Sequence, residues 1–407
     1  MRMSAIRPFR AVRPARDTAA AVSSVPYDVV NTEEARQLAA GNPLSFLHVT
    51  RAEIDLPAGT DPYSQQVYGK ARRQFAALRI SAPLVEEDEP SVYFYRLRMG
   101  GHEQTGIAAC FSVDEYEQDV IKKHERTRRD KEDDRTRHII ELRAQTGLVL
   151  LTYRASEPID RLSRAVTADA PLYDFRADDG VHHTIWRVKG QEATALVDAF
   201  AHVPALYIAD GHHRAASAGR ARAEMRARGD SREADTFIAV AFPSNQMRIL
   251  PYNRVVKDLA GRTPDQFLAA LGARLPVRDG SAIPRGKGDV AMFLAGTWYG
   301  VDLSGAAPLD GSRANALDVA LLQHHVLEPL LAIGDVRIDK RIDFVGGARG
   351  TAALEAAVNT GTAAVAFSMH PVTIEDLMAI SDEGGIMPPK STWFEPKLRD
   401  GLLIHTI

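Results

Sequence analysis

A short apolar segment that runs into an Asp-Gly-His-His-Arg turn limits most strongly what this chain can fold into. The segment Ala205–Ala209 predicts a buried strand, and residues 212–228 predict a helix made of strong helix formers. Between them, Gly211 lets the backbone approach a ligand closely. The first turn of such a helix offers backbone N–H groups and the positive end of the helix dipole. This strand–turn–helix unit therefore suits a phosphate group or a metal ion.

The side chains of the turn fit the same interpretation. Arg214 can direct its guanidinium fork onto phosphate oxygens, and Asp210 can hold Mg²⁺ or orient a hydroxyl group. His212 and His213 point in different directions on a helix, so we do not expect them to share one metal ion. The alternative is structural: an Asp that caps the helix, followed by two exposed histidines.

Hydrophobic patterning elsewhere predicts an α+β protein. A chain of 407 residues is long enough for two to three domains. Ser91–Met99 and residues 102–113 predict two strands joined by a hairpin at Gly100–Gly101. Tyr63–Leu78 has helical apolar spacing. Because β-rich stretches are followed by alternating strands and helices, we expect mixed sheets rather than one parallel sheet.

Four further segments concentrate polar residues. Residues 122–137 hold eight Lys or Arg and five Asp or Glu, a net charge of +3. This segment is either a solvated, salt-bridged helix face or a polyanion site in which Glu125 acts as a base. Asn253 and Arg254 follow a proline turn, where binding and ordinary turn roles are equally compatible. Residues 337–350 alternate charged and apolar residues, as in a strand with one polar face. Residues 386–402 form a polar loop that contains Lys390, Ser391, Thr392 and Trp393, a composition typical of a site.

Several functional classes are disfavoured by composition. No run approaches the roughly 18 apolar residues of a membrane span, and the arginine-containing N-terminus lacks the apolar stretch of a secretory signal. Cys110 is the only cysteine, which excludes an intramolecular disulfide and a multi-cysteine zinc site and fits a cytoplasmic protein. The His pairs at 182–183, 212–213 and 324–325 lack carboxylate partners at metal-ligand spacing, so we expect no zinc site. With a net charge of −3 and no basic arm, the chain is not expected to bind nucleic acid.

Specific motifs make the chain resemble the DUF1015 family from about residue 6 to residue 405. The motifs are RPFRAVRP, SSVPYDVVN, IKKHERTRRDKEDDRTRH, YIADGHHR, ILPYNRVVKDL, RIDFVGG and IMPPKSTWFEPKLRDGL. A second, local resemblance covers residues 105–245. The IKKHE segment and the strand–DGHHR–helix unit are similar to the ParB/sulfiredoxin-like fold as free-serine kinases use it. Sulfiredoxin chemistry itself is not expected, because Cys110 is not beside the phosphate turn.

This resemblance implies a three-part organisation: an N-terminal α+β part over 1–104, a ParB/sulfiredoxin-like nucleotide-binding catalytic unit over 105–245, and a C-terminal α+β part over 246–407 that contributes a polar loop to the site. The implied activity is that of a Mg²⁺-dependent kinase that uses ATP or ADP to phosphorylate a small hydroxy amino acid, namely free L-serine giving O-phosphoserine. A nucleotide phosphohydrolase and a non-catalytic ParB-like nucleotide switch are the alternatives. The expected partners are the nucleotide and the amino acid, and a homodimer is compatible with the sequence.

The resemblance also implies residue roles. Glu125 and Asp210 are the expected catalytic residues, with Asp210 also holding the metal ion. The expected nucleotide- and phosphate-binding residues are Gly211, His212, His213, Arg214, Lys123, His124, Arg126 and Arg135. The expected substrate-binding residues are Lys390, Ser391, Thr392, Trp393, Asn253 and Arg254.

Overall fold

The computed structural model describes residues 6–81, 84–229 and 232–407, which form two compact units. Unit 1 contains the chain up to Met247 together with Pro396–Ile407, and unit 2 is Arg248–Glu395. The domain boundary predicted at 246 lies close to the start of unit 2. The boundary predicted at 104 falls inside the strand β5 (His102–Ser112), which pairs with neighbours on both sides and belongs to the middle of a sheet. The return of the last residues to unit 1 was not predicted.

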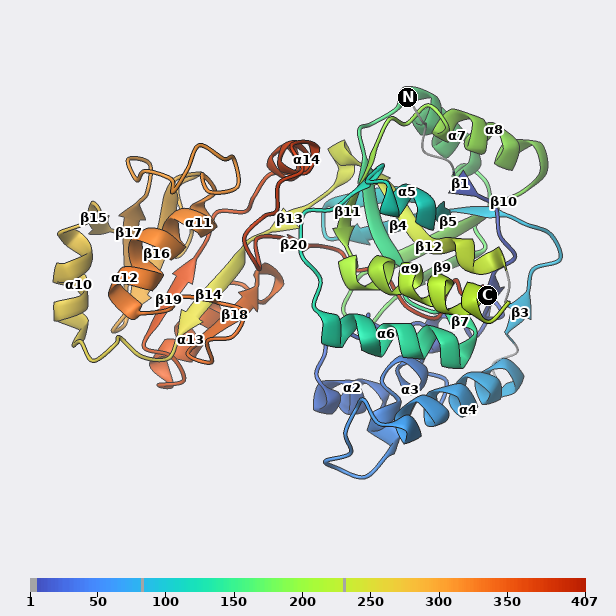
Figure 1. Cartoon of the computed structure of the whole chain (residues 1–407), viewed down its shortest axis with the longest axis horizontal. Helices are drawn as coiled ribbons and strands as arrows, with labels where there is room; N and C mark the ends of the chain where they lie inside the picture. Colours follow the sequence, from blue (N-terminus) through green and yellow to red (C-terminus); the bar gives the residue numbers. More distant parts are fainter. Residues whose placement is uncertain (1–5, 82–83, 230–231) are drawn as a thin grey trace. The chain divides into compact units, whose positions relative to one another are not determined.

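Unit 1 is built on a nine-stranded mixed sheet (Figure 1). In spatial order its strands are β6 (Ile121–Lys122), β11 (Leu206–Asp210), β8 (Val149–Tyr153), β12 (Thr236–Pro243), β5, β4 (Val92–Met99), β10 (His182–Val188) and β9 (Tyr173–Arg176), with β1 (Ile6–Arg7) pairing with β5. Two small ladders join β2 (Val12–Arg13) to β3 (Val85–Glu86) and β7 (Ala144–Gln145) to β21 (His405–Thr406). The pairing of β6 with β11 and that of β8 with β12 are parallel, and the other pairings are antiparallel. This mixture confirms the predicted α+β class.

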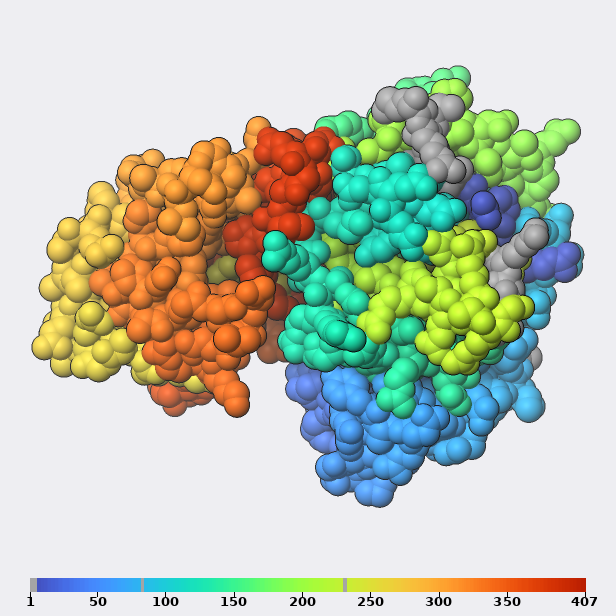
Figure 2. Space-filling view, in the orientation of Figure 1, coloured from blue at the N-terminus to red at the C-terminus, as the bar shows by residue number. Residues whose placement is uncertain are grey.

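Unit 1 also contains helices, some on the sheet and some packed on other helices (Figure 1). They are α1 (Ala19–Val22), α2 (Thr32–Ala39), α3 (Leu47–Thr50), α4 (Gln65–Ser81), α5 (Val113–Glu117), α6 (Arg129–Leu142), α7 (Glu157–Val166), α8 (Gly190–Phe200) and α9 (His212–Ala227). The sheet buries an aromatic and aliphatic core that includes Phe94, Phe111 and Ile208. Figure 2 shows the side chains of α6 and α9 side by side on one face of unit 1, and the two helices pack directly against each other. The charged segment 122–137 is therefore neither one helix nor one loop: a short strand and a loop precede α6.

Unit 2 has a six-stranded sheet of its own. Its order is β15 (Val277–Asp279), β17 (Thr297–Asp302), β16 (Asp289–Leu294), β19 (Val365–Ser368), β14 (Tyr252–Val256) and β18 (Ile342–Gly346). The accompanying helices are α10 (Pro264–Gly272), α11 (Asp318–Leu322), α12 (Glu328–Leu331), α13 (Ala352–Asn359) and α14 (Ile374–Asp382), and β13 (Ile249–Leu250) pairs with β20 (Trp393–Phe394). Within the described residues, no helix combines the length and the apolar character needed to cross a membrane.

Candidate functional site

Two loops meet at one edge of the sheet in unit 1. The strands β6 and β11 run parallel, with Ile121 opposite Leu206 and Lys122 opposite Tyr207. Because parallel strands end at the same edge of a sheet, the segment that follows β6 and the turn that follows β11 emerge together. Residues that are 88 positions apart in the sequence, such as His124 and His212, therefore become neighbours.

The two histidines of the turn hold the loop that follows β6. The backbone N–H of His124 donates to Nε2 of His212 at 3.4 Å, and the backbone N–H of Arg128 donates to Nε2 of His213 at 3.0 Å. An imidazole nitrogen that accepts a hydrogen bond carries no proton. Burial, as the largest cause, lowers the pKa of both histidines, which agrees with neutral rings. These two contacts position the loop, and the predicted binding of phosphate by His212 and His213 stays a prediction.

His124, Glu125 and His212 form a compact group. One potential ligand atom from each residue lies within 4.8 Å of the other two, and the two imidazole rings are 4.4 Å apart at 89°. His124 is buried, and burial lowers its pKa to about 4 although a hydrogen bond at the backbone of Ile208 acts in the opposite direction. Glu125 is the more exposed member. No carboxylate stands at metal-ligand spacing from His212 along the sequence, and Glu125 approaches it in space from another segment of the chain.

Asp210 ends β11 and is held by a lysine from the C-terminal segment. Its carboxylate lies 3.1 Å from Nζ of Lys397 and 3.9 Å from Nη2 of Arg214. Burial raises the pKa of Asp210, but the two cations lower it by more than burial raises it. The pKa of this carboxyl therefore lies well below its usual range. The carboxylate therefore stays ionised and is already neutralised by cations. It does not fit the predicted role of metal ligand in this arrangement.

Gly211 and the start of α9 retain the features expected of an anion site. Gly211 has φ 97° and ψ 28°, a left-handed conformation, and a Cβ there would lie 3.3 Å from Cα of Val149. Among the described residues, no side chain caps the N-terminus of α9, and no acidic residue lies in its first turn. The helix dipole and the first backbone N–H groups therefore favour an anion at this position.

The guanidinium of Arg214 is used inside the protein. It donates to both carboxylate oxygens of Asp28, at 2.9 and 3.2 Å, and to the carbonyl oxygen of Leu148. Burial lowers the pKa of Arg214, but Asp28 and Asp210 outweigh this effect and raise it. Nη1 and Nη2 are therefore engaged inside the protein, whereas the buried Nε has no hydrogen-bond partner among the described residues. Direct contact of Arg214 with phosphate stays a prediction.

The other positively charged side chains predicted to bind phosphate differ in their contacts. Nζ of Lys123 donates to the carbonyl of Tyr116 at 3.0 Å and lies 4.4 Å from the centre of its ring. Arg135 forms an ion pair with Asp134 at 2.7 Å and stacks on the ring of Tyr27 at 4.0 Å. Arg126 is exposed beside Glu125 in sequence. Of these predicted phosphate ligands, only Arg126 projects into solvent.

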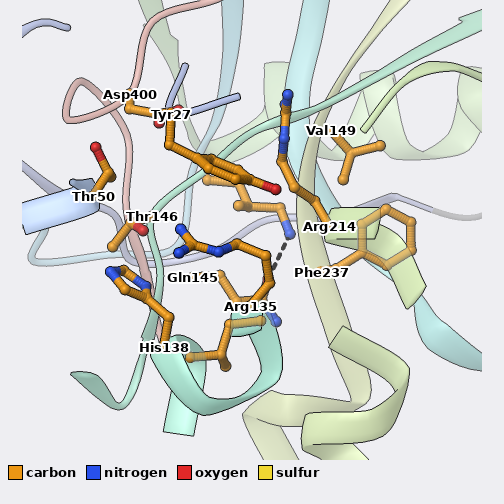
Figure 3. A pocket seen from close by; sticks show the side chains of 13 residues that line it. Tyr27, Thr50, Arg135, His138, Gln145, Thr146, Val149, Arg214, Phe237 and Asp400 are labelled. Atoms are coloured by element: carbon orange, nitrogen blue, oxygen red, sulfur yellow. Dashed lines mark hydrogen bonds between the residues drawn. The ribbon is translucent and has the colours of Figure 1, made fainter. Parts of the chain in front are cut away.

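A cavity lies beneath the turn, with Tyr27, Arg135 and Arg214 on its wall (Figure 3). Its volume of about 30 Å³ has room for one or two water molecules. Asp400 also lines it, and burial raises the pKa of this carboxyl to about 7 while nearby cations oppose the shift. Sequence reasoning missed Tyr27 and Asp400. Lys397 was detectable as part of the polar C-terminal loop, whereas no sequence signal distinguished Asp400.

The residues predicted to bind the substrate lie in unit 2 and have internal partners. Asn253 is buried, and its Oδ1 accepts the backbone N–H of Met369 at 3.0 Å. Arg254 is buried as well and donates to the carbonyl oxygens of Tyr252 and Lys390. These contacts are structural. They hold the end of β19 and the loop before β20.

The other residues predicted to bind the substrate also lie in unit 2, and their contacts are within that unit. Nζ of Lys390 lies 5.3 Å from the ring centre of Tyr252. Ser391 donates to the carbonyl of Pro388 at 2.6 Å, and Nε1 of Trp393 donates to Glu395 at 2.8 Å. Thr392 lies between them and is half-buried. Substrate binding by residues 390–393 stays a prediction.

Comparison with known proteins gives one family match. Residues 6–320 match the model of a family described as "Protein of unknown function (DUF1015)". This range is shorter than the predicted resemblance, which extended to residue 405. No curated protein matches the chain.

Solved structures give distant matches. The chain is similar to a free serine kinase in complex with AMP, with 13% identity and a TM-score of 0.38 over 73% of this chain and 91% of that one. It is similar to SbnI with a C-terminal truncation from Staphylococcus aureus, with 14% identity and a TM-score of 0.39 over 72% and 85%. A conserved hypothetical protein from Pyrococcus furiosus matches with 14% identity and a TM-score of 0.36 over 73% and 94%. These likenesses are distant, and the activity of this chain has to be inferred from its own site.

Proposed function

Because the chain belongs to the DUF1015 family, whose description assigns no activity, we propose a function from the geometry of the site: a kinase that phosphorylates a small hydroxy amino acid. The acceptor is free L-serine, the product is O-phosphoserine, and the donor is ATP or ADP with Mg²⁺. One observation carries this proposal. The parallel pairing of β6 with β11 brings Glu125 to the N-terminus of α9, so that a carboxylate and an uncapped helix start share one edge of the sheet.

The two halves of this arrangement match the two needs of phosphoryl transfer. The reaction requires positioning and charge stabilisation more than covalent catalysis by the protein. The first backbone N–H groups of α9 would bind the phosphates, and the close backbone approach depends on Gly211. Glu125 would accept the proton of the serine hydroxyl as that oxygen attacks the terminal phosphorus. His212 and His213 would act indirectly, by holding the loop that carries Glu125.

Charge around the turn supports the same assignment. The pair of Asp210 and Lys397 leaves the turn without an uncompensated negative charge at the phosphate position. Arg126, which is exposed, would add a positive charge near the leaving phosphate. Mg²⁺ would be bound mainly by the phosphate oxygens and water, as this ion prefers, and would neutralise charge on the nucleotide. Asp210 is not required as its ligand.

Phosphorus NMR of the purified chain tests the proposal. The chain is incubated with ATP or with ADP and Mg²⁺, each with and without L-serine. A phosphomonoester signal that appears only with serine is the expected result. Nucleotide breakdown that proceeds equally without serine would replace the kinase by a phosphohydrolase, and a chain that binds nucleotide without turnover would be a binding switch.

A further inference from the structure

We propose that His124, Glu125 and His212 form a binding site for a divalent transition-metal ion, with Zn²⁺ as the preferred ion. This site does not depend on the proposed kinase activity, since it rests on the arrangement of three side chains. It also differs from the Mg²⁺ expected with a nucleotide, which requires oxygen ligands.

The spacing of the three side chains suits one ion. Their ligand atoms lie within 4.8 Å of one another. Zinc bonds of about 2.0–2.2 Å in a tetrahedral site place ligand atoms about 3.4 Å apart. The group would therefore have to close by less than about 1.5 Å, a movement that rotation of a glutamate side chain provides. Glu125 is the more exposed member of the group.

His124 has the orientation expected of a metal ligand. Its buried Nδ1 has no hydrogen-bond partner among the described residues. The hydrogen bond with the backbone of Ile208 must therefore involve Nε2. A histidine that binds a metal ion through one ring nitrogen commonly donates the other N–H to a backbone carbonyl, which fixes the tautomer. A buried nitrogen without a partner is energetically unfavourable, and a metal ion would satisfy it.

His212 offers a second unprotonated nitrogen. Its Nε2 faces the loop and accepts the N–H of His124 at 3.4 Å, which is long for a hydrogen bond. A metal bond at this nitrogen would take the place of this long contact. The rings of His212 and His124 are nearly perpendicular, so both can direct a nitrogen toward one point without stacking.

The types of ligand atom in this group indicate which metal ions would bind. Two neutral imidazoles and one carboxylate are typical of Zn²⁺ and related transition metals, whereas Mg²⁺ and Ca²⁺ favour oxygen. The single cysteine, Cys110, is buried in β5 and is not part of the group. Three protein ligands leave a fourth position for water or for a substrate atom.

The site has a consequence for the proposed kinase. A metal ion on Glu125 would engage the lone pairs that the carboxylate needs in order to accept the serine proton. Zn²⁺ would then inhibit phosphorylation at about one ion per chain. This consequence rests on the proposed function, whereas the metal site itself does not.

Titration of the full-length, metal-free chain with Co²⁺ and Zn²⁺, without nucleotide, tests the site. Tetrahedral Co²⁺ absorbs visible light, and Zn²⁺ should displace it at one ion per chain, while a large excess of Mg²⁺ should not. Glu125→Gln keeps the shape of the side chain but removes its charge. We expect it to weaken Zn²⁺ binding by more than about 100-fold, beyond the effect typical of residues that only orient a ligand. His124→Ala should have the same effect.

The matched control is His202→Ala, which removes an exposed histidine elsewhere in unit 1. It should bind Zn²⁺ as the unchanged chain does. Equal Zn²⁺ affinity in Glu125→Gln and His202→Ala, or displacement of Co²⁺ by Mg²⁺, would overturn the proposal. Because the spectrum reports metal binding without turnover, its outcome is independent of whether the chain proves to be a kinase.

Discussion

Two polar regions of this molecule use their side chains in opposite ways. At the edge of the sheet in unit 1, a buried imidazole nitrogen of His124 has no partner among the described residues, and the start of α9 has no cap. In unit 2, Asn253 and Arg254 spend their polar atoms on the backbone groups of Met369, Tyr252 and Lys390. Both regions are rich in polar residues. Among these polar atoms, the ring nitrogen of His124 is the one that the fold buries without a partner among the described residues.

The difference shows why a dense cluster of polar residues is a weak indicator of a site. A buried polar group has to be hydrogen-bonded, so most such clusters are satisfied internally. The informative feature is an atom that the fold buries and then leaves without a partner. Arg214 in unit 1 combines both conditions, because its Nη2 pairs with Asp28 while its buried Nε has no hydrogen-bond partner among the described residues.

The largest effect should come from Glu125→Gln. If Glu125 is the base, the substitution should lower kcat for serine phosphorylation by about 10²–10⁴-fold while nucleotide affinity changes little. The measurement is single-turnover phosphorylation together with a nucleotide titration. Glu141→Gln serves as a control, because Glu141 lies in α6 and pairs with Arg72. Undiminished kcat in Glu125→Gln would remove Glu125 from the mechanism.

As the pH falls, we expect unit 1 to lose more of its folding stability than unit 2. The histidines whose pKa is lowered by burial, among them His124 and His138 with values of about 4, all belong to unit 1. A histidine of this kind makes its full contribution to the free energy of unfolding above about pH 6.5, the pKa of a histidine in the unfolded chain. That contribution is lost as the pH falls toward 4, the pKa in the folded chain. Each one contributes about 1.4 kcal/mol per pH unit within that window. Asp400, with a pKa raised to about 7, acts in the opposite direction but is one group against several.

Hydrogen exchange measured between pH 7 and pH 4.5 checks this prediction. After correction for the intrinsic pH dependence of exchange, protection of β12 should fall more than protection of β19, which is a central strand of unit 2. Equal losses in the two strands would show that the buried histidines do not set the acid sensitivity of unit 1.

Asn253→Ala should lower the stability of unit 2 by about 1–3 kcal/mol, because it leaves the buried N–H of Met369 without an acceptor. Denaturant unfolding measures the loss, and the exposed Asn359→Ala provides the comparison. A raised KM for serine with unchanged stability would instead assign Asn253 to substrate binding, as the sequence suggested.

Two substitutions on one helix should give effects of opposite sign. Gly211→Ala should destabilise unit 1 by about 1–2 kcal/mol, since φ is 97° and the new Cβ would approach Val149. Gly219→Ala, in the interior of α9, meets its nearest neighbours at 3.6 Å or more and should stabilise by about 0.5–1 kcal/mol. Thermal unfolding of both variants measures the difference. A stable Gly211→Ala chain that binds nucleotide normally would remove the case for close backbone approach at this turn.

Local structure was predictable to a large extent. The strand before Asp210, the helix after Gly211 and the helix over residues 63–78 are present, the last as α4. The two-residue strand β6 was not predicted, because so short a segment has no periodicity. Yet β6 brings Glu125 to the turn.

The sequence by itself determined the local structure of this site. Apolar spacing, Gly211 and the run of helix formers specify a strand, a left-handed turn and a helix whose first turn can bind an anion. The tertiary structure alone decided which polar groups remain available. Lys397 neutralises Asp210 from 187 residues away, Asp28 takes Arg214 from 186 residues away, and His124 meets His212 across 88. Hydrogen bonds and ion pairs depend on distance in space, and sequence patterns report only distance along the chain.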